Sequence, residues 1–312
     1  MGKIALIGAA GQIGTPLSLL CKASDLFDEI SLYDIVHVPG IATDLMHIDT
    51  KAKALAGADI VVVTAGIARK PGMTRDDLFK TNASIIRDIF SEIASTCPNA
   101  ISCVVTNPVN STVPVAAETL EKAGVFEPRR LFGVTTLDVV RASTFAAHAL
   151  GGNIEPKQLR VPVIGGHSGA TILPLYSQAQ PVVHLSDEQL ALVINRVQFG
   201  GDEIVKSKQG AGSATTCMAY AGFRFVKALM SAQSGQSVTE EAYVYLPGIP
   251  GGDKLAVELG VDYFAVKVQI GTKGATKVLP IGDLSGNEKK LLEAALCELK
   301  TNIATGVSFM RV

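Results

Sequence analysis

The feature that most constrains the fold is a run of glycines between an apolar segment and a segment of helical spacing. Gly8, Gly11 and Gly14 follow the β-branched stretch 4–7 and open the helix-like stretch 12–23. Glycines in such a turn permit a tight bend and let main-chain amides approach a pyrophosphate at the positive end of the helix. A glycine turn also suits a purely structural bend. The spacing, a variant of the commoner G-x-G-x-x-G, therefore needs support from its context.

An acidic residue at a suitable distance supplies that support. Asp34 follows the next predicted strand, 29–33, and lies about 20 residues beyond Gly14. A carboxylate there can accept hydrogen bonds from the ribose hydroxyls and would repel a 2′-phosphate. We therefore predict that the loop, including Gln12 and Ile13, binds a dinucleotide, and that this dinucleotide is NAD and not NADP.

The first half of the chain alternates short apolar runs with segments of helical spacing. The apolar runs are β-branched and apolar on both faces, which is typical of strands buried in a parallel sheet. They cover 4–7, 29–33, 59–64 and 101–106, and the helical segments cover 12–23, 77–96 and 111–123. Repeated βα units of this kind predict an α/β fold with a Rossmann-type doubly wound parallel sheet.

After about residue 150 the pattern changes to short strands and longer helices. Ser186 with Gln189, and Ser285 with Glu288, match the capping box that opens a helix. Strands are expected at 160–164, 171–173, 241–246 and 263–270, and helices from Ser186 towards Gly200, over 214–232, and from Ser285 to near Gly306. We therefore predict two domains, an NAD-binding domain over 1–142 and an α+β catalytic domain over 143–312.

Composition excludes several classes of protein. Hydrophobic residues make up 47% and charged residues 18% of the 312 residues, and the net charge is −1. This balance lacks the basic footprint of a nucleic-acid-binding or membrane-surface protein, and no apolar stretch reaches the ~18 residues that span a bilayer. Residues 1–8 read as a strand and not as a targeting peptide. We expect a cytoplasmic protein, or a mitochondrial-matrix protein whose transit peptide has been removed.

The cysteines argue against a disulfide framework and against a metal site. Cys21, Cys97, Cys103, Cys217 and Cys297 form no CxxC pair, and their number is odd. The histidines do not cluster near them, as a zinc site would require. We predict buried free thiols in a reducing compartment, and no bound metal.

Two further patterns carry chemistry. Asp138 and Arg141 are spaced to share one face of a helix, and the arginine fork suits a carboxylate; the alternative is an exposed ion pair of little energetic value. His167 lies among small residues in 165–169, and an unperturbed imidazole exchanges a proton near pH ~6.5. The other four histidines are interpreted as structural or surface residues.

Ordered motifs along nearly the whole chain resemble the lactate/malate dehydrogenase family, most closely its mitochondrial and enterobacterial branch. They are the glycine loop, Gly66 to Phe79 with Arg69 and Arg75, Val105 to Asn110, Thr135 to Arg141, and Ile164 to Gly169. The resemblance implies reversible hydride transfer between NAD and a small dicarboxylic acid. It implies a homodimer or homotetramer without deciding between them.

The resemblance also implies roles for single residues. His167 would be the acid/base, Asp138 would hold its ring, and Arg141 would bind the carboxylate beside the reacting carbon. Arg75 would polarise the ketone oxygen from a closing loop. Arg69 would bind a second carboxylate, which selects malate and oxaloacetate over lactate and pyruvate, because a guanidinium under a closed lid needs an anionic partner.

Three more residues match family positions near the reacting groups. Asn82 and Asn107 would lie near the nicotinamide and the substrate, and Met218 would pack beside them, although core packing in a helix explains Met218 as well. For Arg69 and Arg75 the alternative is a solvated basic loop. Between Asp49 and Leu55 the chain is shorter than the relatives, where that segment usually supplies a strand.

Other classes of protein account for fewer features. A lactate dehydrogenase, or another 2-hydroxy acid dehydrogenase of the family, would share everything except Arg69. A short-chain dehydrogenase needs a Tyr-x-x-x-Lys pair on a helix, whereas Tyr263 and Lys267 lie in a strand-like segment. A non-catalytic NAD-binding protein would have no need of His167, Asp138 and the three arginines.

Overall fold

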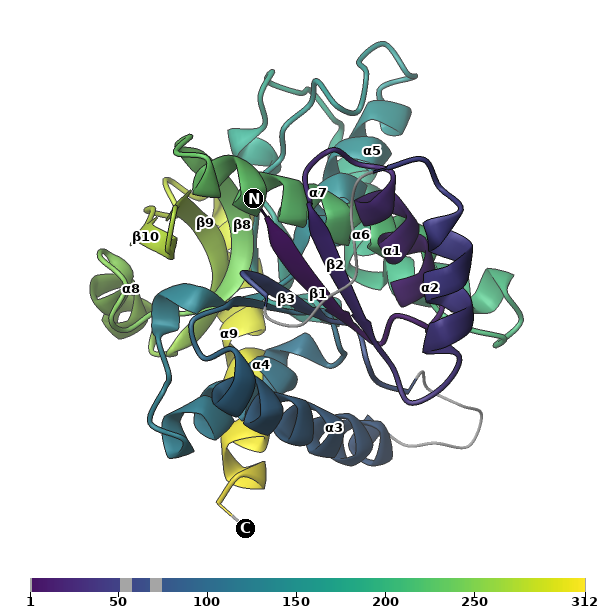
Figure 1. Cartoon of the computed structure of the whole chain (residues 1–312). Helices are drawn as coiled ribbons and strands as arrows, with labels where there is room; N and C mark the ends of the chain where they lie inside the picture. Colours follow the sequence, from purple (N-terminus) through teal and green to yellow (C-terminus); the bar gives the residue numbers. More distant parts are fainter. Residues whose placement is uncertain (1, 51–57, 68–74, 312) are drawn as a thin grey trace.

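The computed structural model of the chain describes residues 2–50, 58–67 and 75–311, and these form a ten-stranded sheet covered by helices (Figure 1). In the first half, strands and helices alternate as predicted. The elements are β1 (Lys3–Ile7), α1 (Gly14–Lys22), β2 (Glu29–Tyr33), α2 (Val38–Met46), β3 (Ile60–Val63), α3 (Arg75–Thr96), β4 (Ile101–Val104), α4 (Val109–Lys122), β5 (Leu131–Gly133) and α5 (Thr136–Ala149).

The strand order places a ligand site. The order is β2-β1-β3-β4-β5, and each of these strands is parallel to its neighbours. The direction of winding reverses between β1 and β3, and in open α/β sheets ligands bind beyond the carboxyl ends of the strands at such a switch point. The predicted Rossmann-type sheet is confirmed, and a ligand site is expected at the turns that follow β1 and β3.

Burial on both faces explains why the central strands are so apolar. Every residue of β3 and β4 is buried. Figure 1 shows α3 and α4 on one side of these strands and α1 on the other. A strand covered on both faces has no solvent-facing positions, which favours continuous β-branched sequence over alternation.

The second half continues the same sheet in antiparallel fashion, as an α+β arrangement. β8 pairs with β5 and β9, β9 pairs with β6, and β6 pairs with β7, all antiparallel. The elements are β6 (Val163–Gly165), β7 (Ile172–Pro174), α6 (Asp187–Ser207), α7 (Thr216–Gln233), β8 (Val238–Tyr245), α8 (Gly252–Leu259), β9 (Tyr263–Gly271), β10 (Gly274–Val278) and α9 (Gly286–Phe309). A second apolar core lies between α5, α6 and β6.

Both predicted capping boxes are confirmed, whereas both helices continue past the glycines near which they were expected to end. Ser186 and Ser285 cap α6 and α9 with the expected reciprocal hydrogen bonds. α6 passes Gly200 and ends at Ser207, with a non-helical residue at Phe199. α9 passes Gly306, where a Cβ would lie 2.3 Å from the Ser111 carbonyl oxygen. Glycine at 306 therefore serves a close helix crossing and does not end the helix.

Several elements escaped the sequence analysis. α2, α8, β5 and β10 were not predicted. Tyr263 and Lys267 lie in β9, as expected. The shortened segment before Leu55 falls within 51–57, outside the described residues.

The cysteines are free, but only two of the five are buried. Burial raises the pKa of the Cys21 thiol to about 12 and also raises that of Cys103, so neither is a ready nucleophile. Cys297 is exposed, which corrects the prediction for that residue. Within the described ranges, no helix is long and apolar enough to cross a membrane, and no group of histidine, cysteine and acidic side chains is arranged to hold a metal ion.

Candidate active site

The glycine loop lies at the carboxyl end of β1, where the topology places a ligand. Gly8 has a φ of +89° and donates its amide to the Tyr33 carbonyl at 2.8 Å. A Cβ on Gly14 would lie 1.9 Å from the Gly8 oxygen, so a side chain there would separate α1 from the loop. The loop therefore requires glycine at both positions, for a left-handed turn and for close packing of strand and helix.

The surroundings of the loop suit a dinucleotide. Asp34 follows β2, and its carboxylate accepts the Ala10 amide at 2.9 Å and the Ile35 amide at 2.7 Å. The amides of Gln12 and Ile13, at the start of α1, donate to no other described residue. Free amides at a helix N-terminus bind phosphate, and a neighbouring carboxylate can bind a ribose. This part of the chain fits NAD.

Asn82 and Asn107 meet beyond the ends of β3 and β4. The Asn82 side chain, 2% exposed, accepts the Ile67 amide at 2.8 Å and donates to the Asn107 carbonyl at 2.7 Å. Asn82 thus ties together the turns that follow two neighbouring strands. Met218 lies in the first turn of α7 and belongs to the main apolar core. Core packing within a helix, the alternative to a place beside the reacting groups, therefore accounts for its position.

A histidine–aspartate pair lies at the centre of the candidate site. Asp138, in the first turn of α5, is fully buried, and its Oδ2 lies 2.5 Å from Nδ1 of His167, on the turn after β6. A carboxylate in this position holds the ring and stabilises the imidazolium. It leaves Nε2 as the nitrogen that can exchange a proton with a substrate.

Arg141 completes the described part of the site. Its guanidinium lies 3.7 Å from Oδ1 of Asp138, and the arginine side chain is only 11% exposed. The alternative of an exposed surface pair is therefore wrong. This distance is too long for a hydrogen bond, and Arg141 makes none with the rest of the described chain. Its donors are free for a substrate carboxylate.

Gly200 makes room for Arg141 and was missed by the sequence analysis. A Cβ on Gly200 would lie 3.1 Å from Nε of Arg141. The non-helical Phe199 precedes Gly200 and Gly201, and glycines of this kind commonly accompany a kink. A glycine within a helical pattern was the available signal, but it was interpreted as a helix end.

The side chains of the two loop arginines both lie outside the described part of the structure. Arg69 lies outside the described residues. Arg75 is the first residue of α3, and its side chain is likewise outside the description. The roles of both therefore rest on the sequence resemblance.

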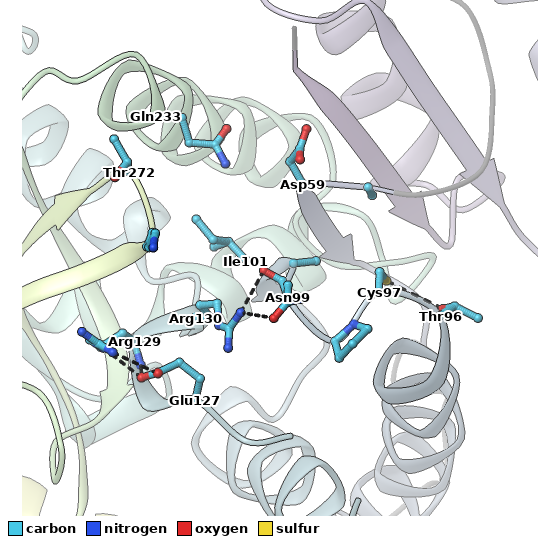
Figure 2. Close-up of a pocket in the computed structure, with 14 residues that line it drawn as sticks. Asp59, Thr96, Cys97, Asn99, Ile101, Glu127, Arg129, Arg130, Gln233 and Thr272 are labelled. Carbon is cyan, nitrogen blue, oxygen red and sulfur yellow. Dashed lines mark hydrogen bonds and ion pairs between the residues drawn. The ribbon is translucent and has the colours of Figure 1, made fainter. Parts of the chain in front are cut away.

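A large cavity elsewhere lacks the chemistry of this site (Figure 2). Its volume is about 720 Å³, and it lies at the amino ends of β3 and β4, opposite Asn107. Arg129 pairs with Glu127 at 2.9 Å, and Arg130 donates to Asn99 at 2.7 Å (Figure 2). The described lining includes no histidine. Its described lining therefore offers no histidine–carboxylate pair, so the candidate site remains at the opposite edge.

Fold and site together define a nucleotide-dependent dehydrogenase, and comparison with known proteins identifies the family. The model of the lactate/malate dehydrogenase NAD-binding domain matches residues 2–133, and that of the family's alpha/beta C-terminal domain matches 135–310. The chain belongs to the lactate/malate dehydrogenase family.

Similar proteins cover the chain almost completely. Mitochondrial malate dehydrogenase of Schizosaccharomyces pombe is 48% identical over 322 residues, and that of Homo sapiens is 47% identical; each alignment covers 99% of this chain and at least 91% of the relative. The crystal structure of Cryptosporidium parvum malate dehydrogenase has a TM-score of 0.81 at 29% identity and covers 98% of this chain and 99% of that one. These alignments span more residues than the chain contains, in keeping with the expected shortening.

Proposed function

We propose that this chain acts as an NAD-dependent malate dehydrogenase, interconverting malate and oxaloacetate by reversible hydride transfer. The observation that carries the proposal is the 2.5 Å contact between His167 and buried Asp138, beside a free arginine. Full-length relatives named malate dehydrogenase support it.

The histidine moves the proton of the reaction. A bound nicotinamide would accept the hydride that leaves C2 of malate. His167 Nε2 takes the hydroxyl proton in malate oxidation and returns it to the ketone oxygen in the reverse direction. Asp138 accepts the hydrogen bond from Nδ1, which keeps Nε2 turned towards the substrate and stabilises the imidazolium. No further proton carrier is needed.

The arginines divide the substrate between them. Arg141 binds the carboxylate next to C2 through its unused donors, Arg75 polarises the ketone oxygen, and Arg69 binds the second carboxylate. Planar guanidinium groups suit these anions better than lysine would. Asn107 lies beside the reacting carbon and the nicotinamide, and Arg69 gives the preference for a dicarboxylic acid.

The cofactor is held by the loop after β1. Gly8, Gly11 and Gly14 give the backbone its shape, the amides of Gln12 and Ile13 bind the pyrophosphate, and Asp34 binds the adenosine ribose. Asn82 and Met218 lie near the nicotinamide end. Asp34 favours NAD because a 2′-phosphate would meet its negative charge.

Replacing His167 with asparagine tests the mechanism. We expect His167→Asn to lose malate oxidation and oxaloacetate reduction while NADH still binds, because the substitution removes the proton carrier and leaves the loop after β1 intact. Steady-state kinetics and NADH fluorescence titration measure the two properties. Turnover near the wild-type level would refute the assignment of His167.

The oligomer is proposed to be a homodimer or homotetramer. α1 packs on both α2 and α7, and each of the three helices exposes a large apolar side chain. These are Leu19, Met46 and Tyr220, with 48%, 69% and 45% of their surface exposed. Exposed apolar side chains on neighbouring helices suit contact with a second copy of the chain. Light scattering of the purified protein would give the mass, and a monomer would contradict the proposal.

The domain boundary and the compartment belong to the proposal as well. We keep the division between 1–142 and 143–312, which limited proteolysis would test through the position of cleavage. The proposed compartment is the cytoplasm, with the mitochondrial matrix as the alternative because the relatives named above are mitochondrial. Microscopy of the tagged protein in its own cells distinguishes the two.

A further inference from the structure

The turn that carries His167 is held by an asparagine from another element. Asn110, on α4, is 1% exposed, and its Oδ1 accepts the main-chain amide of His167 at 2.8 Å. The His167 ring is held by Asp138 on α5, whereas its backbone is held from α4. The histidine is thus fixed at two points by two different helices.

The amide nitrogen of Asn110 is held in turn by three oxygens. Nδ2 lies 3.0 Å from Ser168 Oγ, 3.1 Å from Thr171 Oγ1 and 3.0 Å from Asn302 Oδ1, and these three acceptors share its two protons. Thr171 Oγ1 donates its own proton to the Ser168 carbonyl. The other two partners are hydroxyl oxygens, whereas Asn302 offers its side-chain carbonyl oxygen, Oδ1. A carbonyl oxygen accepts without having to orient a proton of its own.

The contact leaves little freedom for the asparagine to rotate. A Cβ on Gly166 would lie 2.6 Å from both Asn110 Oδ1 and Thr171 Oγ1, so the turn is packed directly against the amide. If Asn110 were to flip, its NH₂ group would face the His167 amide, and two donors would meet in a buried place. An unpaired buried donor costs about 1–3 kcal/mol, so the orientation of Asn110 matters.

Asn302 is well placed to set that orientation because α9 is fixed on either side of it. At the start of the helix, buried Glu288 accepts the Ser177 hydroxyl at 2.6 Å. At Asn302 itself, the Ser111 hydroxyl donates to the main-chain carbonyl at 2.8 Å. One turn further on, Gly306 lets α9 approach α4 closely. Asn302 thus brings α9 into hydrogen-bond contact with the residue that holds the His167 turn.

We propose that Asn302, acting through Asn110, is a positioning residue for His167. The inference rests on the proposed function, in which His167 is the acid/base. Removing the Asn302 oxygen takes away one of the three acceptors around Asn110 Nδ2. This weakens the hold on the Asn110 amide, and through it on the backbone of His167, while the contact of His167 with Asp138 can persist. Small displacements of a catalytic group reduce the rate of the chemical step more than they reduce binding.

The test compares two substitutions at Asn302 with a matched control in the same helix. Asn302→Ala removes the acceptor, Asn302→Asp keeps an oxygen in its place, and Asn287→Ala makes the same change at an exposed position of α9. We expect kcat for oxaloacetate reduction to fall about tenfold in Asn302→Ala, with the Kd of NADH unchanged. Asn302→Asp and Asn287→Ala should stay within about twofold of wild type.

The outcomes separate this inference from the proposed function. Circular dichroism and the thermal midpoint establish that each variant is folded, so that kcat refers to folded enzyme. A normal kcat in Asn302→Ala would overturn the inference, as would an equal loss in Asn302→Asp, which would show that an acceptor oxygen at this place does not sustain kcat. His167→Asn is assayed alongside: turnover in that variant would overturn the proposed function, whereas an inactive His167→Asn beside a fully active Asn302→Ala would overturn only the role of Asn302.

Discussion

At the scale of single residues, the site combines side chains that are far apart in the chain. Asp138 and His167 are separated by 29 positions and meet at 2.5 Å. Spacing on a helix predicts that Asp138 and Arg141 share a face, but only the family resemblance predicted the partner of His167. Gly200 and Asn110 were not predicted because their roles, leaving room and holding a backbone amide, arise from tertiary contacts that no local pattern marks.

A buried acid outside the site gives a prediction at the same scale. Glu241, on β8, is 1% exposed, and its Oε1 has no hydrogen-bond partner among the described residues. Burial raises the pKa of this carboxyl, against the opposing effect of Arg160, Lys267 and Arg224. The folded chain therefore holds a proton that the unfolded chain has released, and its free energy of unfolding falls as the pH rises towards the folded-state pKa.

Glu241→Gln replaces the titrating carboxyl with an amide, which removes its contribution to the pH dependence of the free energy of unfolding. We expect the variant to gain stability relative to wild type as the pH rises above the ordinary pKa of a glutamate, because burying the charged form costs free energy and glutamine carries no charge. Urea unfolding at several pH values measures the difference, with the exposed Glu293→Gln on α9 as control. Curves that stay parallel for wild type and Glu241→Gln would contradict the prediction.

At the scale of elements, local signals predicted the capping boxes but not the role of two glycines within helices. The capping boxes at Ser186 and Ser285 depend on neighbouring residues and were read correctly. Glycine is ambiguous, because it can end a helix or let another backbone approach. At Gly200 and Gly306 it does the second, which only the packed structure reveals. Strands β3 and β4, buried on both faces, were predicted because their composition follows directly from burial.

Glycine-to-alanine substitutions should have opposite effects at the crossing of α9 with α4 and at an open position of α6. Gly306→Ala should lose about 1–2 kcal/mol of stability, because its Cβ would lie 2.3 Å from the Ser111 oxygen and overpacking outweighs the gain in helix propensity. Gly201→Ala, within α6 and with no atom near its Cβ, should gain about 0.5–1 kcal/mol. Denaturant unfolding compares them, and a stabilised Gly306→Ala would contradict the close crossing.

At the scale of the whole molecule, one sheet joins the two predicted halves. The βα repeats predicted the parallel part, and the alternating segments predicted the antiparallel pairing of β8 with β9. That β8 continues the parallel sheet beside β5 could not be predicted, because the contact joins residues about a hundred positions apart, Gly133 and Tyr243. Because the sheet is continuous, α5, which carries Asp138, and the His167 turn are both anchored on the same sheet.

The most direct test of the account is NADH oxidation by the purified protein with oxaloacetate and with pyruvate, measured side by side. We predict a preference for oxaloacetate of roughly 10³-fold or more in kcat/KM, because Arg69 under a closed loop needs the second carboxylate. Arg69→Gln, assayed in parallel, should lose oxaloacetate reduction far more than pyruvate reduction. A wild-type preference for pyruvate would contradict the account and make the chain a lactate dehydrogenase on the same scaffold.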